Sequence, residues 1–253
     1  MLHARSIGAW AACLVLSGCS LFEGDGQVTL SVADAPVDGL GEVVLQFNRV
    51  TFVTDDDERE SFTFAQPQQV NLLEFTGGEH FALLSGEVLP DGRYRKIEFR
   101  VDASPDTTES YVTVAGDDQQ EPLDVPEEFE PQLAVSTDFT IDRDSDLEIT
   151  VDFDLRRSLF QTGDGSYELR PRLRVVLDDE AGTVGGTVSD NLLNDCPGPA
   201  VYAFNGSGTA PDDVDGSSPE PVNSAVVDAI DGSYAIGFLE AGSYTLAFTC
   251  DAD

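Results

Sequence analysis

Short runs of alternating apolar and polar residues recur along most of the chain, and a period of two is typical of half-buried β-strands. The clearest runs are Val28–Val32, Val43–Phe47, Ile97–Asp102 and Tyr111–Val114. Turn signals rich in Gly, Pro and Asp separate the runs, as at Pro90–Gly92. No stretch has the period of an amphipathic helix. The pattern therefore predicts an all-β protein, built as an antiparallel sandwich or barrel.

Two longer runs, Leu147–Leu155 and Leu169–Leu177, flank a turn signal at Gly163–Gly165. A hairpin centred near residue 162 would join them and align acids of the first run with arginines of the second. The expected pairs are Asp154 with Arg170, Asp152 with Arg172, and Arg156 with Glu168. We expect these pairs on the exposed outer face, where they set the register and contribute little stability, rather than in metal binding or acid/base catalysis.

The first residues have the build of a secretory signal, because Arg5 precedes an apolar run, Ile7–Leu16, that is too short to span a bilayer. The run ends in Leu-Ser-Gly-Cys at residues 16–19, which resembles the bacterial lipobox. The resemblance implies cleavage after residue 18 and lipidation of Cys19, and two or more acyl chains hold a protein stably on a membrane. The alternative is ordinary cleavage of a secreted protein, with Cys19 an incidental thiol. Ser20, in place of Asp, resembles the sorting signal for the outer membrane of Gram-negative bacteria.

Acidic residues dominate the charge, with 48 Asp+Glu against 13 Lys+Arg and a formal net charge of −35. Such a surface repels nucleic acid and anionic lipid, so neither is an expected partner. A carboxylate-rich surface with Lys96 as its only lysine is typical of a protein that folds in high salt, where self-repulsion is screened. The alternative is that some acidic clusters bind Ca²⁺, although most such runs are solvated surface.

Four cysteines divide between the predicted signal and the mature chain. Cys13 lies in the signal and Cys19 is assigned to the lipid, which leaves Cys196 and Cys250. Two cysteines in an oxidising compartment predict one disulfide between them. The alternative is a pair of free, buried thiols.

Several segments of the first region occur in a specific order and spacing. They are Leu30–Asp38, Val70–Leu73, Leu89–Tyr94, Asp152–Arg156 and Leu169–Pro171. Together they resemble the bacterial lipoprotein family of domain of unknown function 4382, over residues 26 to about 177. The family usually has Asp where this chain has Asn71, which weakens any role assigned to that position. The family carries no assigned catalysis, so the resemblance implies a fold and an envelope location only.

An acidic linker at residues 178–182 precedes a second set of strands over residues 183–253. Its run from Asp231 to Leu246 reads G-x-Y-x-I-x-x-L-x-x-G-x-Y-x-L, which predicts two strands joined by a glycine-tipped turn. The run resembles the prealbumin-like, carboxypeptidase-regulatory-like β-sandwich, which implies a spacer or adhesion module. With only about five strands expected, the sandwich would lack a final strand at its C-terminal end.

Most catalytic and metal motifs are missing from the sequence. Once the signal is removed His80 is the only histidine, and no nucleophile elbow, zinc spacing or phosphate loop occurs. The run from Asp142 to Asp146 begins like an EF-hand but has Leu147 and Phe153 at the positions that need Gly and Glu. The only tryptophan, Trp10, lies in the signal, which weighs against a sugar-binding surface. We therefore predict no catalytic residue, no metal site and no cofactor.

These observations predict two antiparallel β-sandwich domains in tandem after a cleaved lipoprotein signal peptide. The expected segments are a signal peptide at 1–18, a lipidated tether at 19–25, a first domain at 26–178 and a second domain at 183–253. The leading hypothesis is a lipid-anchored structural or interaction protein of the cell envelope without catalytic activity, bound to the membrane through Cys19 and to an envelope protein or glycan. The alternatives are a surface carbohydrate-binding or Ca²⁺-dependent adhesion module and, third, an envelope hydrolase.

Overall fold

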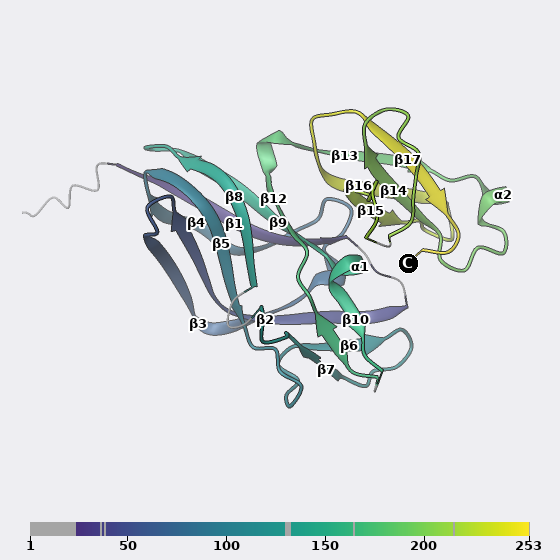
Figure 1. Cartoon of the computed structure of the whole chain (residues 1–253), viewed down its shortest axis with the longest axis horizontal. Coiled ribbons are helices and arrows are strands. Elements are labelled where there is room, and N and C mark those ends of the chain that lie inside the picture. Colours follow the sequence, from purple (N-terminus) through teal and green to yellow (C-terminus); the bar gives the residue numbers. More distant parts are fainter. Residues whose placement is uncertain are drawn as a thin grey trace, which may run out of the picture.

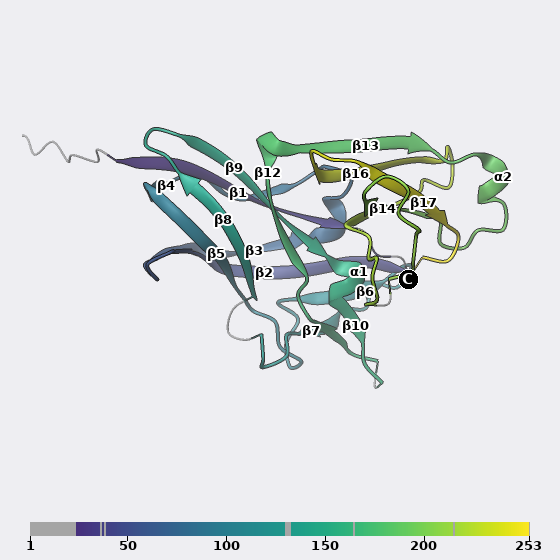
Figure 2. The ribbon, with the colours of Figure 1, turned by 45° about the horizontal axis from the view of Figure 1, so that its top comes forward.

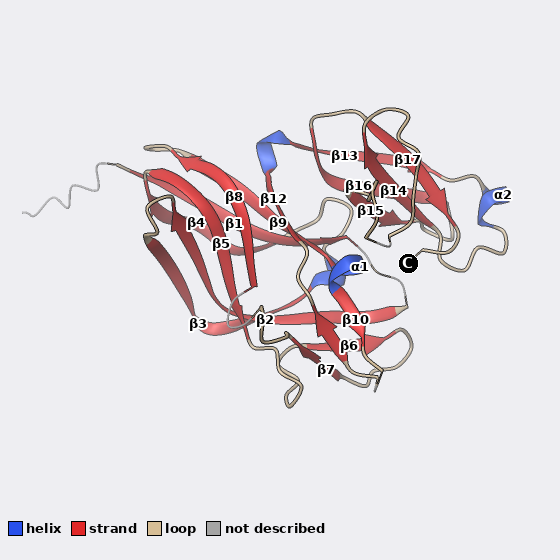
Figure 3. Ribbon diagram, viewed as in Figure 1, coloured by secondary structure: helices blue, strands red, loops and turns tan. Residues whose placement is uncertain are grey.

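The computed structural model describes residues 24–35, 37, 39–129, 133–163, 165–214 and 216–252. Cys19 and the predicted signal therefore lie outside the described residues. The described chain forms two β-rich domains that pack against each other, a larger one built from the N-terminal part and a smaller one from the C-terminal part (Figure 1). Helices are confined to single turns (Figure 3). None of the helices in the described part of the chain is long and apolar enough to cross a membrane.

Two sheets make up the first domain. One has the strand order β12-β9-β1-β4, and the other has the order β10-β11-β7-β6-β2-β5-β8 with β3 paired to β2. The bounds are β1 Asp25–Ala35, β2 Leu40–Thr54, β3 Arg59–Asn71, β4 Phe81–Pro90, β5 Gly92–Val101, β6 Tyr111–Val114, β7 Glu121–Asp124, β8 Leu133–Ile141, β9 Asp146–Asp154, β10 Leu159–Gln161, β11 Tyr167–Leu169 and β12 Leu173–Leu177. Single turns η1, Leu72–Glu74, and α1, Leu155–Ser158, follow β3 and β9.

The core of the first domain lies between these sheets, as the alternating pattern predicts. Phe47 on β2, Phe99 on β5 and Phe153 on β9 are fully buried. Their ring centroids lie 5.8 to 6.1 Å apart with strongly inclined planes, an arrangement that adds to the stability gained from burial. The prediction of an all-β sandwich is confirmed for this region.

Not every strand pair is antiparallel. β1 lies between β4, its antiparallel partner, and β9, with which it runs parallel from Gln27 opposite Asp146 to Ala35 opposite Asp154. β11 and β7 are also parallel. The parallel pair arises because the chain returns to one edge of β1 with β4, then builds most of the other sheet, and reaches the second edge of β1 only with β9.

The predicted hairpin between Leu147–Leu155 and Leu169–Leu177 is wrong in register and in exposure. β12 pairs with β9 so that Arg174, not Arg172, lies opposite Asp152. The strand ends at Asp154, and the helical turn α1 and the small pair β10 and β11 use up the residues that the hairpin assigned to one continuous ladder. Asp152 is only 2% exposed, because the second domain covers the face that was expected to be solvated.

The second domain is a small sandwich of a two-stranded sheet, β13-β16, and a three-stranded sheet, β15-β14-β17. The bounds are β13 Ala181–Thr187, β14 Ala200–Asn205, β15 Asn223–Val226, β16 Ser233–Glu240 and β17 Tyr244–Thr249, with the turns η2 at Asp178–Glu180 and α2 at Asp190–Leu193. β16 and β17 are the two strands expected from the glycine-rich run, but they belong to different sheets, so the turn between them crosses the sandwich.

Candidate functional site

The junction between the two domains is the candidate site, because polar and charged side chains are buried there. Its apolar part is small, with Phe238 of β16 packed against Ala33 of β1 and Val176 of β12. Beside it the backbones of the domains touch: a Cβ added at Gly237 would lie 2.4 Å from the backbone nitrogen of Gly78. The second domain is therefore seated directly on the ends of β1, β9 and β12 (Figure 2).

Asp152 is the centre of the polar contacts across the junction. Its Oδ2 accepts a hydrogen bond of 2.6 Å from Nη2 of Arg174 and one of 3.3 Å from Nδ2 of Asn223, which belongs to the second domain. Arg174 also donates from Nη1 to the carbonyl oxygen of Phe238 at 2.5 Å. A buried carboxylate on one domain and a guanidinium that reaches the other thus bind the domains to each other.

A second buried carboxylate, Asp34, lies near Asp152 on the adjacent strand. Its Oδ1 accepts the backbone N–H of Leu155 at 3.2 Å, and its Oδ2 has no hydrogen-bond partner within the described structure. Burial, followed by the negative charge of Asp152, raises the pKa of Asp34 well above its ordinary value. Burial also raises the pKa of Asp152, although the charge of Arg174 opposes that shift.

The turn α1 places two more arginines at the junction. Asp154 caps this turn by accepting the backbone N–H of Arg157 at 3.2 Å, and the two side chains also form an ion pair. Arg156 lies over the ring of Tyr202 in the second domain, with its guanidinium carbon 5.7 Å from the ring centre. The capped turn therefore holds Arg157 within the first domain and directs Arg156 toward the second domain.

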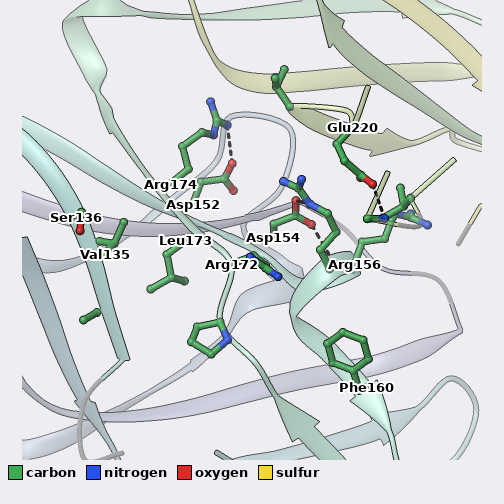
Figure 4. Close-up of a pocket in the computed structure, with 16 residues that line it drawn as sticks. Val135, Ser136, Asp152, Asp154, Arg156, Phe160, Arg172, Leu173, Arg174 and Glu220 are labelled. Carbon is green, nitrogen blue, oxygen red and sulfur yellow. Dashed lines mark hydrogen bonds and ion pairs between the residues drawn. The ribbon is translucent and has the colours of Figure 1, made fainter. Parts of the chain in front are cut away.

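A pocket of about 770 Å³ opens beside these residues, between α1, β8, β12 and a loop of the second domain (Figure 4). It is lined by Ala134, Val135, Ser136, Asp152, Asp154, Arg156, Arg157, Phe160, Pro171, Arg172, Leu173, Arg174, Val214, Gly216, Glu220 and Val222. Four arginines on one pocket wall are unusual in a chain with so few cations. The pocket combines guanidinium donors with apolar surface, and such pockets at domain interfaces are common ligand sites.

Residues 25–171 match a family model that is described as a domain of unknown function (DUF4382). The chain belongs to this DUF4382 family. The match contains α1, Phe160 and both buried aspartates, and it ends just before Arg172 and Arg174. No curated protein and no solved structure matches the chain significantly.

The residues named from sequence lie in different places relative to this site. Cys19, the predicted lipidation site, is outside the described residues. Cys196 and Cys250 form the expected disulfide in the second domain, with their Cα atoms 4.7 Å apart, away from the DUF4382 domain. His80 is exposed, and its ring centre lies 6.2 Å from that of Phe238 at the junction.

Two acidic clusters lie in separate turns. The run considered for calcium, Asp142–Asp146, spans the turn between β8 and β9 and ends at the first residue of β9, and a second run, Asp55–Glu58, forms the turn between β2 and β3. Within the described residues, no group of three or more His, Cys, Asp or Glu side chains is arranged to hold a metal ion.

The junction pocket was missed from sequence, although two signals point toward it. Five of the twelve arginines lie between residues 156 and 174, in the last part of the first domain. From residue 175 to the end the chain has no Lys, Arg or His. An arginine-rich segment followed by a purely anionic region predicts that the two lie against each other, because opposite charges favour contact.

Proposed function

We propose that this chain is a lipid-anchored interaction protein of the bacterial cell envelope, held at the outer membrane through Cys19 and without catalytic activity. The observation that carries the proposal is the placement of the N-terminal end of the described chain relative to the second domain. β1 begins at Asp25 at the end of the first domain that lies farthest from the second domain (Figures 1 and 2). A membrane tether that enters there would leave the second domain projecting outward.

The buried junction supports a role as a rigid projection. Arg174 and Asn223 join the second domain to Asp152 of the first, and the backbones approach closely at Gly237 and Gly78. These buried polar contacts, rather than the small apolar contact, would restrict the motion that is otherwise expected between linked domains. The first domain would then act as a spacer between the membrane and the second domain.

The second domain supports an interaction role by its shape and surface. Its small sandwich of five described strands is compatible with the proposed prealbumin-like, carboxypeptidase-regulatory-like assignment. Ile230 is 95% exposed and Leu192 is 54% exposed, and their turns pack together, since a Cβ added at Gly232 would lie 3.3 Å from Leu193. Two exposed aliphatic side chains of this kind offer a contact surface for an envelope partner.

The contacts of the buried acids favour a structural role over catalysis. Asp34 caps the backbone at Leu155, and Asp152 binds Arg174 and Asn223. These contacts give both acids a positioning role within the fold. A hydrolase activity of the purified chain that disappears in Asp152→Asn would contradict the non-catalytic part of the proposal.

The anchor is tested by comparing Cys19→Ala with the parent chain in membrane fractions and by metabolic labelling with a fatty-acid analogue. We expect Cys19→Ala to be unlabelled and released from the membrane with its fold intact. Cys13→Ala is the matched control, because it removes a cysteine only six residues away and leaves Leu-Ser-Gly-Cys unchanged. A Cys19→Ala protein that stays in the membrane fraction would refute the anchor.

The second candidate function is carbohydrate binding, and the junction pocket favours it. The pocket holds an exposed aromatic ring, Phe160, beside polar groups, which is the combination that sugar rings require. The chemistry of this pocket narrows the class of ligand further.

A further inference from the structure

Arg172 is the group in the junction pocket that is available to a ligand. Arg174 is bound to Asp152, Arg157 is paired with Asp154, and Arg156 lies over Tyr202. The guanidinium of Arg172 is exposed and has no partner within the described structure.

The backbone of Arg172 is nevertheless held on both sides. Its N–H donates to Oγ of Ser158 at 2.8 Å, and its carbonyl accepts the N–H of Asp154 at 3.0 Å. Figure 4 shows the side chain directed into the pocket. The fixed backbone sets the position from which the free guanidinium reaches the pocket, and ordering of the side chain is part of the cost of binding.

The surroundings of Arg172 favour a single carboxylate over other anions. A guanidinium binds a carboxylate with two parallel hydrogen bonds, and the fork geometry of the two groups matches. Asp154 and Glu220 line the same pocket, and the chain as a whole carries a formal charge of −35. This negative field disfavours phosphate dianions and polyanions, whose additional charge would find no second free cation in the pocket.

The other exposed groups of the pocket suit a ring with hydroxyl groups. Phe160 is 41% exposed; Arg170 lies 4.9 Å from its ring centre. Ser136 on β8 adds an exposed hydroxyl, and Leu173 adds apolar surface. The volume of about 770 Å³ falls within the range of small-molecule sites and is sufficient for one or two sugar rings.

The pocket forms only when the two domains are docked. Its outer wall is the segment of the second domain that contains Glu220 and Val222, whereas Arg172 and Phe160 belong to the first domain. Glu220 is held in place because its Oε1 accepts the backbone N–H of Gly216 at 2.5 Å. A ligand in the pocket would contact both domains and bind only to their docked arrangement.

We propose that the junction pocket binds a small ligand that carries one carboxylate on a hydroxylated ring, such as a uronic acid, with Arg172 as the carboxylate-binding residue and Phe160 as the stacking residue. The proposal deepens the carbohydrate-binding candidate and does not depend on the lipid anchor. The anchor and the pocket can therefore fail separately, since one is tested by fractionation of cells and the other by a soluble chain.

The test is calorimetric titration of the chain from residue 20 onward, made without lipid, with the two monocarboxylates galacturonate and glucuronate at a fixed moderate ionic strength. Galactose, acetate and inorganic phosphate are titrated in parallel. We expect saturable binding of the uronates, with galactose, acetate and phosphate at least about 10-fold weaker. Arg172→Gln should weaken uronate binding by about 10- to 100-fold, and Phe160→Ala by about 2- to 10-fold.

Arg100→Gln is the matched control, because Arg100 is an exposed arginine without a partner within the described structure and lies outside the pocket. It changes the net charge by the same amount as Arg172→Gln and should bind the uronates as the parent does. Arg172→Lys keeps the charge but loses the planar fork, so intermediate affinity is expected. Thermal unfolding without ligand checks that each variant is folded.

Each of the following outcomes would overturn the proposal. They are equal binding of galactose and galacturonate, phosphate binding as tight as uronate binding, uronate binding unchanged in Arg172→Gln, and no binding of either uronate to the folded parent chain. Weak binding reduced equally in Arg172→Gln and Arg100→Gln would also overturn it, because that result would reflect the overall charge rather than a site.

Discussion

The two domains differ sharply in how they are stabilised. A buried apolar cluster of thirty residues supports the first domain. The first domain also contains every lysine and arginine from residue 24 onward. In the second domain the largest cluster has seven buried residues, and from Ala181 to the end this region has eleven acids and no Lys, Arg or His. A domain of this size buries so little apolar surface that packing alone leaves it only marginally stable. We therefore expect the second domain to depend on its disulfide and on the arginines of its neighbour.

The largest expected effect comes from removing the disulfide with Cys196→Ser and Cys250→Ser together. The bond joins residues 54 apart, and the chain-entropy model gives such a loop a stabilisation of about 4 kcal/mol. Amide hydrogen exchange should show loss of protection in β13 to β17, while β2, β5 and β9 keep theirs. Equal loss of protection in both domains would mean that they unfold as one cooperative unit and that the contrast between them is wrong.

The next effect comes from breaking the buried ion pair at the junction. Arg174→Met leaves the carboxylate of Asp152 without its strongest partner, and we expect a loss of about 2–3 kcal/mol in the free energy of unfolding. Asp152→Leu combined with Arg174→Met should recover most of this loss, because no uncompensated charge is then buried.

The control for Arg174→Met and for the double variant is Arg172→Met, two residues away on the same segment. Its guanidinium has no partner within the described structure, so the free energy of unfolding should change by less than about 0.5 kcal/mol. Chemical denaturation followed by fluorescence or circular dichroism measures all four proteins. A loss in Arg172→Met as large as that in Arg174→Met would show that charge at this edge, and not the ion pair, holds the domains together.

A smaller effect is expected from pH. The native-state pKa of Asp34 is raised above its unfolded value, so the folded chain retains the proton over a range in which the unfolded chain has lost it. The resulting stabilisation is complete below about pH 4, and it is lost as the pH rises through the native-state pKa, by at most about 1.4 kcal/mol per pH unit.

Asp34→Asn tests this sign, because the amide cannot ionise and its oxygen can still accept the N–H of Leu155. The variant should lose less stability than the parent as the pH rises from about 4 to 8 at matched ionic strength. Parallel pH profiles of the two proteins would contradict a raised pKa at Asp34.

The smallest effect is expected from salt. Addition of NaCl screens the repulsion among acids, and the second domain has no cations of its own to offset that repulsion. We expect high salt to protect β13 to β17 by up to about 1 kcal/mol more than β2 and β5, as measured by hydrogen exchange. CaCl₂ at the same ionic strength should give the same result as NaCl. An increase in hydrogen-exchange protection that is specific to micromolar Ca²⁺ would support a calcium site instead.

Local pattern predicted the strands well because alternation depends only on neighbouring residues. Tyr111–Val114 and Val43–Phe47 lie within strands as expected. The parallel partner of β1 could not be predicted in this way, since β9 begins more than a hundred residues later and alternation does not encode which strands pair. The disulfide was predictable because only two cysteines remained after the signal and the predicted lipidation site Cys19 were set aside.

The junction was not predictable from charge pattern alone. Asp152 alternates with apolar residues as a solvated acid does, and it is buried because the second domain covers that face. The hairpin register failed because Asp154 caps a helical turn, which a strand pattern does not reveal. The alternating pattern did not single out Asp34 either, although the fold buries it and its carboxylate accepts the N–H of Leu155.

The position of β1 between β4 and β9 sets the order in which the protein can fold during and after synthesis. β1 is made first, yet one of its two edges remains unpaired until residues 146–154 have been made. Closing so long a loop is slow, and it exposes a hydrophobic strand to aggregation while it waits. We expect refolding to be slow and to depend on protein concentration, with protection of the β1–β9 pair among the last to appear in pulsed hydrogen exchange. A chaperone that binds this strand would therefore increase the yield of refolded protein more than one that acts on the second domain.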